Sequence, residues 1–232
     1  MASPTYTSAL IVGAGQGLSA SLTRLLRKEG LAVAIAARDT AKLAPLCTET
    51  GARAFRCDAQ DEAQVQRLFA DIDREHGAPD VAIYNASART RGPFVELVPA
   101  DVQHALQVTA FGAFLVAQQA AARMLGKGRG AILFTGASAS VKGYAQSAPF
   151  AMGKFALRGL TQSLARELSP RGIHVAHFVI DGGIRGAGRD DPARPDALLD
   201  PDAIAFTYLN VLRQPRSAWT SEVELRPWVE RF

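Results

Sequence analysis

The chain has 232 residues, of which 48% are hydrophobic and 21% are charged, a composition typical of a globular protein. Its length suits one α/β domain over residues 1–232 with a single large core. The formal net charge is +4, but the basic residues are scattered along the chain, so we expect no nucleic-acid partner. No apolar run approaches the length of a membrane span, and we expect no membrane partner.

The two cysteines, Cys47 and Cys57, lack the spacing of metal ligands, so no metal is expected. They are typical of free thiols in a reducing compartment, which predicts a cytoplasmic protein. The first residues lack the basic and apolar regions of a secretory leader, which favours the same compartment.

The chain opens with a predicted strand, a glycine-rich turn and a helix. The apolar run Ala9–Val12 predicts a buried strand, and Gly13, Gly15 and Gly17 follow it directly. A helix is predicted next from leucines at helical spacing: Leu18, Leu22, Leu25 and Leu26. Glycines let the backbone approach a pyrophosphate, and a helix N-terminus offers free N–H groups, so this unit predicts a dinucleotide site. The alternative is a tight turn without a ligand.

Strands and helices alternate along the rest of the chain. A second buried strand is predicted over residues 32–36. Further strands are predicted over residues 52–56, 81–84, 130–135 and 173–180, and an alternating closing strand over 221–225. Helices are predicted between them, the longest over residues 101–125 and 150–169. This alternation implies a doubly wound, mostly parallel sheet of Rossmann type with seven strands.

Arg38 follows the second predicted strand, at the place where such folds select their cofactor. An acidic residue there binds the ribose hydroxyls of NAD, but this chain has Ala37 followed by Arg38. A cation suits the 2′-phosphate of NADP, so we expect NADP in preference to NAD, with NAD as the other possibility. The alternative for Arg38 is a solvated loop charge.

The chain resembles the short-chain dehydrogenases/reductases. The resemblance rests on the glycine turn, on Asn85-Ala86 after the fourth strand, on Lys154 in its helix and on the sequence Gly-Ile-His-Val at residues 172–175. It implies a nicotinamide cofactor held by the following residues: Gly13, Gly15, Gln16, Gly17, Leu18, Arg38, Asp58, Ala59, Asn85, Ala86, Ser87, Lys154, Gly182 and Ile184.

The chain departs from the family at the residues that move the substrate proton. The Tyr of the family's Y-x-x-x-K motif is Phe150 here, as in a divergent subgroup of the family, and only Lys154 is kept. The usual Ser is Ala137, with Ser138 beside it, and the Asn of the V-N motif is Thr109. We therefore expect Lys154 to hold the cofactor ribose and Ser138 to orient the substrate. Tyr144 is a candidate displaced proton donor, the alternative being a loop residue that covers apolar surface.

The resemblance implies an NADP-preferring oxidoreductase that transfers hydride to or from a carbonyl or activated alkene of a small-molecule substrate, with a non-standard proton donor. The alternative is a catalytically silent NADP(H)-binding sensor or scaffold. Residues 185–200 are rich in proline and arginine, and we expect a mobile lid there. Relatives pair their two long helices across a two-fold axis, so a homodimer or homotetramer is expected.

Overall fold

A seven-stranded parallel sheet runs through the computed structural model, which describes residues 5–186, 188, 194 and 196–230. The strand order is β3-β2-β1-β4-β5-β6-β7, and every neighbouring pair is parallel. The strands are β1 Ser8–Val12, β2 Ala32–Ala37, β3 Arg53–Arg56, β4 Val81–Tyr84, β5 Gly130–Thr135, β6 Ile173–Ile180 and β7 Glu222–Leu225. The predicted seven-stranded, doubly wound sheet is confirmed.

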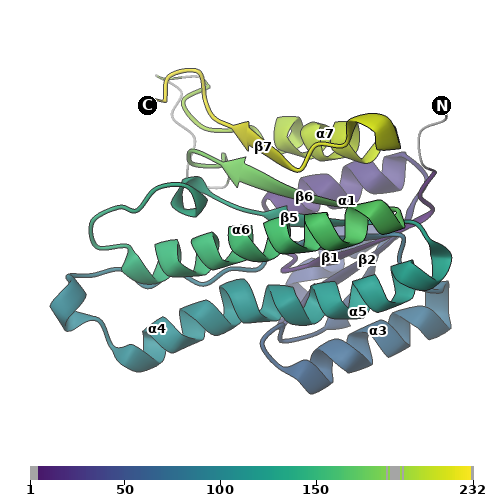
Figure 1. Ribbon diagram of the computed structural model, residues 1–232, viewed down its shortest axis with the longest axis horizontal. Coiled ribbons are helices and arrows are strands. Elements are labelled where there is room, and N and C mark those ends of the chain that lie inside the picture. Colours follow the sequence, from purple (N-terminus) through teal and green to yellow (C-terminus); the bar gives the residue numbers. More distant parts are fainter. Residues whose placement is uncertain (1–4, 187, 189–193, 195, 231–232) are drawn as a thin grey trace.

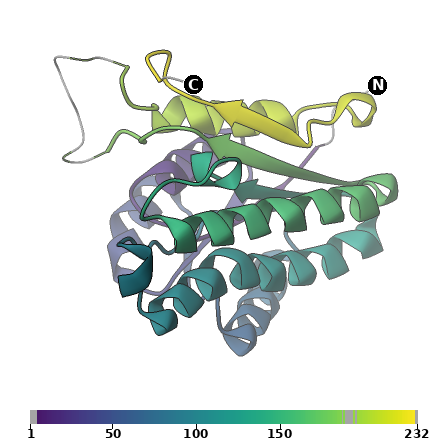
Figure 2. The same ribbon diagram turned by 60° about the vertical axis from the view of Figure 1, so that its left-hand side comes forward.

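Helices cover both faces of the sheet (Figure 1). They are α1 Leu18–Lys28, α2 Ala44–Thr50, α3 Glu62–His76, α4 Pro99–Leu106, α5 Gly112–Lys127, α6 Ala148–Leu168 and α7 Pro201–Leu212. Helices α1, α2 and α7 pack on one face, whereas α3, α5 and α6 pack on the other, and Figure 2 shows the same layers from another side. Both faces of the strands are therefore buried, which explains their nearly continuous apolar sequences.

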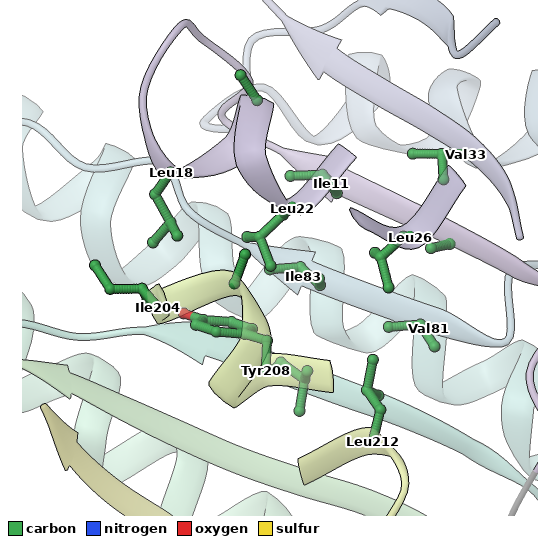
Figure 3. Close-up of a cluster of buried hydrophobic side chains, with 14 of the residues drawn as sticks. Ile11, Leu18, Leu22, Leu26, Val33, Val81, Ile83, Ile204, Tyr208 and Leu212 are labelled. Carbon is green, nitrogen blue, oxygen red and sulfur yellow. The ribbon is translucent and has the colours of Figure 1, made fainter. Parts of the chain in front are cut away.

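Figure 3 shows the core between α1, α7 and the sheet. Alternate residues of each strand point to opposite faces of the sheet, so only every second one enters this core. In β1, Ile11 points into this core, whereas Leu10 and Val12 point into the core on the opposite face. Leucines of α1 and residues of α7 such as Tyr208 meet over the central strands. Helix α1 follows β1 and helix α7 follows β6, so their packing connects the two halves of the sheet.

The order of strands reverses between β1 and β4, and the chain segments that leave these strands lie side by side. The pairing runs to Val12 opposite Tyr84, so the glycine turn and the segment from Asn85 emerge together. Gly13 has φ +87°, and a Cβ there would lie 2.3 Å from the backbone nitrogen of Ala86. Only glycine permits this contact. This crevice is where doubly wound sheets bind ligands.

The predicted uninterrupted helix over residues 101–125 is wrong in one respect. Between α4 and α5 the chain forms a π-helical turn, Gln107–Phe111. The Tyr84 hydroxyl donates a hydrogen bond to the carbonyl of Val108 in this turn. Gly112 then lies against that hydroxyl, because an added Cβ would be 2.5 Å from it. A contact from β4, distant in sequence, thus stabilises a turn that helical periodicity does not predict.

By length and composition alone, the continuous helical stretch Pro99–Lys127 could span a membrane, contrary to the sequence-based expectation. Half of its most apolar window is buried inside the protein, however. It packs against α3, α6 and β5, as the core helix of a globular domain does.

The expected lid over residues 185–200 lies partly outside the described residues, since residues 187, 189–193 and 195 are not among them. The two ends of the segment pair with each other. Ile184 and Leu199 form a parallel bridge, and the Leu199 backbone N–H donates to the Gly183 carbonyl at 2.8 Å. Arg185 also forms an ion pair with Asp200. Its mobility stays a prediction.

Candidate cofactor and substrate site

Two adjoining cavities lie in the crevice at the carboxyl ends of the strands. The first, of about 510 Å³, lies between the glycine turn and the ends of β2 and β3. The second, of about 950 Å³, lies over α6 and the ends of β5 and β6. Asn85 and Ser87 line both cavities, so the two form one continuous site.

All of the site residues predicted from the sequence line one of these cavities. The first is lined by Gly13, Gly15, Gln16, Arg38, Asp58, Ala59, Asn85, Ala86 and Ser87. The second is lined by Gly17, Leu18, Asn85, Ser87, Ser138, Tyr144, Lys154, Gly182 and Ile184.

The glycine turn leaves room for a ligand at the start of α1. Apart from the glycine and its chain neighbours, no atom of the described residues lies within 4 Å of the positions that a Cβ would take at Gly15 and Gly17. No side chain caps the first turn of α1, so its N–H groups face this space without a side-chain acceptor. Ser19 accepts a hydrogen bond from the Gly15 N–H at 2.8 Å. The turn therefore fits a pyrophosphate, and the Ser19 hydroxyl braces its backbone.

Two cations line the first cavity. Arg38 follows directly after β2, and Lys42 lies in the short 3-10 helix Ala41–Leu43. Lys42 is 3.3 Å from the carboxylate of Asp39, which balances its charge. Arg38 is thus a cation that can contact a phosphate group in this cavity. Lys42 was not among the residues predicted from the sequence, because nothing in its local pattern points to this cavity.

Lys154 and Phe150 face the second cavity from the same side of α6. The Lys154 Nζ donates a hydrogen bond to the carbonyl of Thr135 at 2.7 Å and lies 5.8 Å from the centre of the Phe150 ring. The lysine is only 3% exposed, and its burial, with a smaller effect from Arg89, lowers its pKa to about 7. The helical register thus places a phenyl ring, without a hydroxyl, beside the lysine ammonium.

Thr109, at the family's Asn position, makes a structural contact. It is 1% exposed, and its hydroxyl accepts a hydrogen bond from the Ala88 N–H at 3.2 Å. It also packs against Gly153, where a Cβ would be 3.0 Å from the Thr109 Cβ. Its hydroxyl oxygen is therefore engaged in anchoring the segment after β4.

The two neighbouring serines after β5 have different environments. Ser140 is fully buried, and its hydroxyl accepts a hydrogen bond from the Ala137 N–H at 3.1 Å. Ser138 is half-buried and lines the second cavity. Of the two, Ser138 is the one that can contact a ligand there.

Tyr144 is 48% exposed and lies beside a charged pair at the second cavity. Lys142 is 3.0 Å from the carboxylate of Asp181, which also lies 3.3 Å from Arg226. The Asp181 hydrogen bond raises the pKa of Lys142, and the Tyr144 hydroxyl acts in the same direction. Tyr144 is thus a phenol with an ammonium next to it.

Arg89 and Arg91 also line the second cavity, and the sequence analysis did not assign them to the site. The Arg89 guanidinium carbon lies over the Phe150 ring, 4.2 Å from its centre. Both arginines follow closely after the carboxyl end of β4. This end of a parallel strand faces the crevice, so their place in the sequence indicates a position near the site.

Comparison with known proteins gives a consistent picture. Residues 7–188 match the family model described as short chain dehydrogenase. A crystal structure of a short-chain dehydrogenase from Rhodopseudomonas palustris is 34% identical, with a TM-score of 0.84 over 97% of this chain and 100% of that one.

Two further proteins are more distant. The D-threitol dehydrogenase of Mycolicibacterium smegmatis is 28% identical over 172 residues, which is 72% of this chain and 66% of that protein. A metagenomic short-chain oxidoreductase solved in complex with NADP is 24% identical, with a TM-score of 0.84 over 97% of this chain and 98% of that one. This structure shares the fold.

Proposed function

Because the chain belongs to the short-chain dehydrogenase family, we propose that it is an NADP-preferring oxidoreductase with a non-standard proton donor. It transfers hydride to or from a carbonyl or an activated alkene of a small molecule. The observation that carries this proposal is the continuous site from Arg38 to Lys154, because it has both the phosphate-binding turn and the lysine that holds a nicotinamide ribose.

The preference for NADP is supported by Arg38 and by the absence of a carboxylate at Ala37. A structural neighbour with the same fold was solved with NADP, which is consistent with this choice. When bound, the nicotinamide supplies or accepts the hydride. The protein binds the dinucleotide through the first turn of α1 and the edge formed by Asn85 and Ser87.

In this proposal, the remaining side chains orient the substrate and move a proton. Lys154 holds the ribose hydroxyls, and Ser138 donates a hydrogen bond to the substrate oxygen. Phe150 has no proton to transfer, so Tyr144, which lines the same cavity, is the donor. The Asp181 carboxylate holds Lys142 in place.

A second function, a silent NADP(H)-binding sensor or scaffold, is favoured by two observations. Phe150 lacks the family's phenol, and the Thr109 hydroxyl is engaged with the backbone of Ala88. Such a protein binds the cofactor without turnover.

Cofactor titration combined with a substrate screen separates these functions. We expect NADPH to bind more tightly than NADH, by about 1–3 kcal/mol for a charge-assisted phosphate contact. Arg38→Ala removes this preference, whereas Arg74→Ala, an exposed arginine on α3, keeps it. A screen of aldehydes, ketones and enoyl thioesters is expected to consume NADPH in the wild type and not in Tyr144→Phe. NADPH binding without consumption by any substrate would favour the sensor.

A further inference from the structure

A buried carboxylate lies at the end of β6, beside the second cavity. Asp181 is 2% exposed, lines this cavity, and its N–H donates to the Leu225 carbonyl of β7 at 2.8 Å. Burying a carboxylate is costly unless cations compensate its charge. Two cations do so here, since the Lys142 ammonium lies 3.0 Å and the Arg226 guanidinium 3.3 Å from it. The carboxylate therefore joins three chain segments at the edge of the site.

Lys142 depends on this carboxylate more than Arg226 does. Arg226 also forms an ion pair with Glu224, two residues before it in the chain. Within the described residues, Lys142 forms an ion pair with Asp181 and with no other carboxylate, and 37% of its side chain is exposed. A long side chain with this exposure loses conformational freedom when it is held in one place. Asp181 is the group that holds it.

Two contacts anchor the Tyr144 loop, residues 142–147, which lies between β5 and α6. The Gln146 carbonyl accepts a hydrogen bond at 3.1 Å from a backbone N–H of the loop after β4. At the other end, the Lys142 ammonium donates to the Asp181 carboxylate, which directly follows a strand of the sheet. Tyr144 lies halfway between these two contacts along the chain. Asp181 therefore fixes the loop to the sheet, whereas the Gln146 contact fixes it to another loop.

We propose that Asp181 is a positioning residue for proton transfer: through Lys142 it holds the Tyr144 loop, and with it the phenol, at the second cavity. A proton donor must lie within hydrogen-bond reach of the substrate oxygen, and a displacement of about 1 Å can cost ~10²-fold in rate. A donor on a loop needs such an anchor because regular backbone does not place it. This inference rests on the proposed function for the role of Tyr144 as donor.

Fluorine NMR tests the anchor without any need for turnover. The chain has four tyrosines, so labelling with 3-fluorotyrosine gives a simple spectrum, in which Tyr144→Phe identifies the signal of Tyr144. In Asp181→Asn and in Lys142→Met, this signal is expected to move towards that of free 3-fluorotyrosine, while the other three stay in place and report an intact fold. Lys142→Arg keeps the charge and is expected to keep the wild-type signal.

The matched control removes an ion pair elsewhere. Glu49 pairs with Arg24 at 2.7 Å between α1 and α2, on the other face of the sheet from α6. Glu49→Gln is expected to keep both the wild-type spectrum and the wild-type rate.

Turnover separates positioning from general damage to the site. Asp181→Asn is expected to lower kcat for NADPH consumption about tenfold or more, while the Kd for NADPH stays within about threefold of the wild-type value. The double variant with Phe150→Tyr is expected to recover this loss, because a phenol on α6 beside Lys154 does not depend on the Tyr144 loop. Phe150→Tyr is expected to repair Tyr144→Phe to the same extent. Damage of another kind would remain in the double variant.

An unmoved Tyr144 signal or an unchanged kcat in Asp181→Asn would overturn the proposal. Repair of Tyr144→Phe but not of Asp181→Asn by Phe150→Tyr would do the same. If Asp181→Asn fails to fold, Lys142→Met provides the same tests, because Asp181 then keeps Arg226 as its partner. A moved signal without NADPH consumption by the wild type would contradict the oxidoreductase function, and proton transfer with it, and leave only the anchor. Wild-type consumption that Asp181→Asn does not lower would leave that function intact and remove Asp181 from the reaction.

Discussion

Phe150 and Lys154 show how one residue changes the chemistry of a site while the helix around it is kept. The four-residue spacing puts both side chains on one face of α6, and the second cavity opens onto that face. The sequence predicted this juxtaposition because helical spacing is a local property. It did not predict that Arg89 covers the ring, because the arginine lies on a loop without periodicity and far along the chain from Phe150.

Restoring the phenol tests how much the missing hydroxyl matters. In Phe150→Tyr the ring keeps its volume, and the new hydroxyl lies near the Lys154 ammonium, which lowers the phenol pKa. If the proton donor was the only missing part, carbonyl reduction is expected to rise by roughly 10²–10⁴-fold. If Tyr144 already acts as donor, Phe150→Tyr adds little, and Tyr144→Phe abolishes the native activity. Steady-state rates of both variants decide between these outcomes, and no change in either one contradicts hydride transfer.

If Lys154 holds the cofactor as proposed, cofactor binding is expected to depend on pH. Its pKa in the free protein is lowered to about 7 by burial, so the ammonium is lost as the pH rises through that value. A bound anionic cofactor favours the ammonium, and NADPH affinity is therefore expected to fall above pH ~7, by no more than about tenfold per pH unit. Fluorescence titrations from pH 6 to pH 9 measure this for the wild type and for Lys154→Met. If NADPH affinity depended on pH in the same way in both proteins, Lys154 would have no role in binding the cofactor.

At the scale of elements, the regular strands and helices follow from local sequence, whereas the π-helical turn Gln107–Phe111 does not. The turn is stabilised by the hydrogen bond from the Tyr84 hydroxyl to Val108 and needs the small residue at Gly112. These contacts come from an adjacent strand, so periodicity within the helix cannot reveal them. The turn matters for the site because Thr109, which anchors Ala88, lies within it.

Gly112→Ala tests this dependence. The added Cβ would lie 2.5 Å from the Tyr84 hydroxyl and 2.8 Å from the Ala59 carbonyl oxygen, so the turn must shift. We expect a loss of about 1–3 kcal/mol in the free energy of unfolding, measured by urea denaturation. Gly126→Ala, in the same helix with nothing within 4 Å, is the control and is expected to be neutral or stabilising by up to ~1 kcal/mol. Equal free energies of unfolding for the two variants would contradict the dependence of this turn on a glycine beside Tyr84.

At the scale of the whole molecule, helices α5 and α6 lie side by side on one face of the protein (Figure 1). Their outer surfaces, with the adjoining π-helical turn, expose four large apolar side chains: Phe111, Phe114, Met152 and Phe155. Exposed apolar side chains gathered on one face are typical of an interface between subunits. The sequence indicated these two helices as the interface but not which side chains are exposed.

We therefore predict a homodimer or homotetramer that associates through α5 and α6. Light scattering at micromolar concentration is expected to give two or four chain masses for the wild type. Phe155→Asp places a charge in the interface and is expected to weaken association by at least tenfold. Phe206→Asp, exposed on α7 at the other face of the sheet, is expected to retain this interface. A monomeric wild type would contradict the prediction.

Transfer of a labelled hydride distinguishes an oxidoreductase from a protein that only binds NADP(H). The protein is incubated with NADPH that carries deuterium at both C4 positions of the nicotinamide, together with aldehydes, ketones and enoyl thioesters, and the products are analysed by mass spectrometry. We expect a product one mass unit heavier than the unlabelled product, formed by the wild type and lost in Tyr144→Phe. NADPH binding without label in any product, in the wild type and in Phe150→Tyr alike, would contradict this expectation.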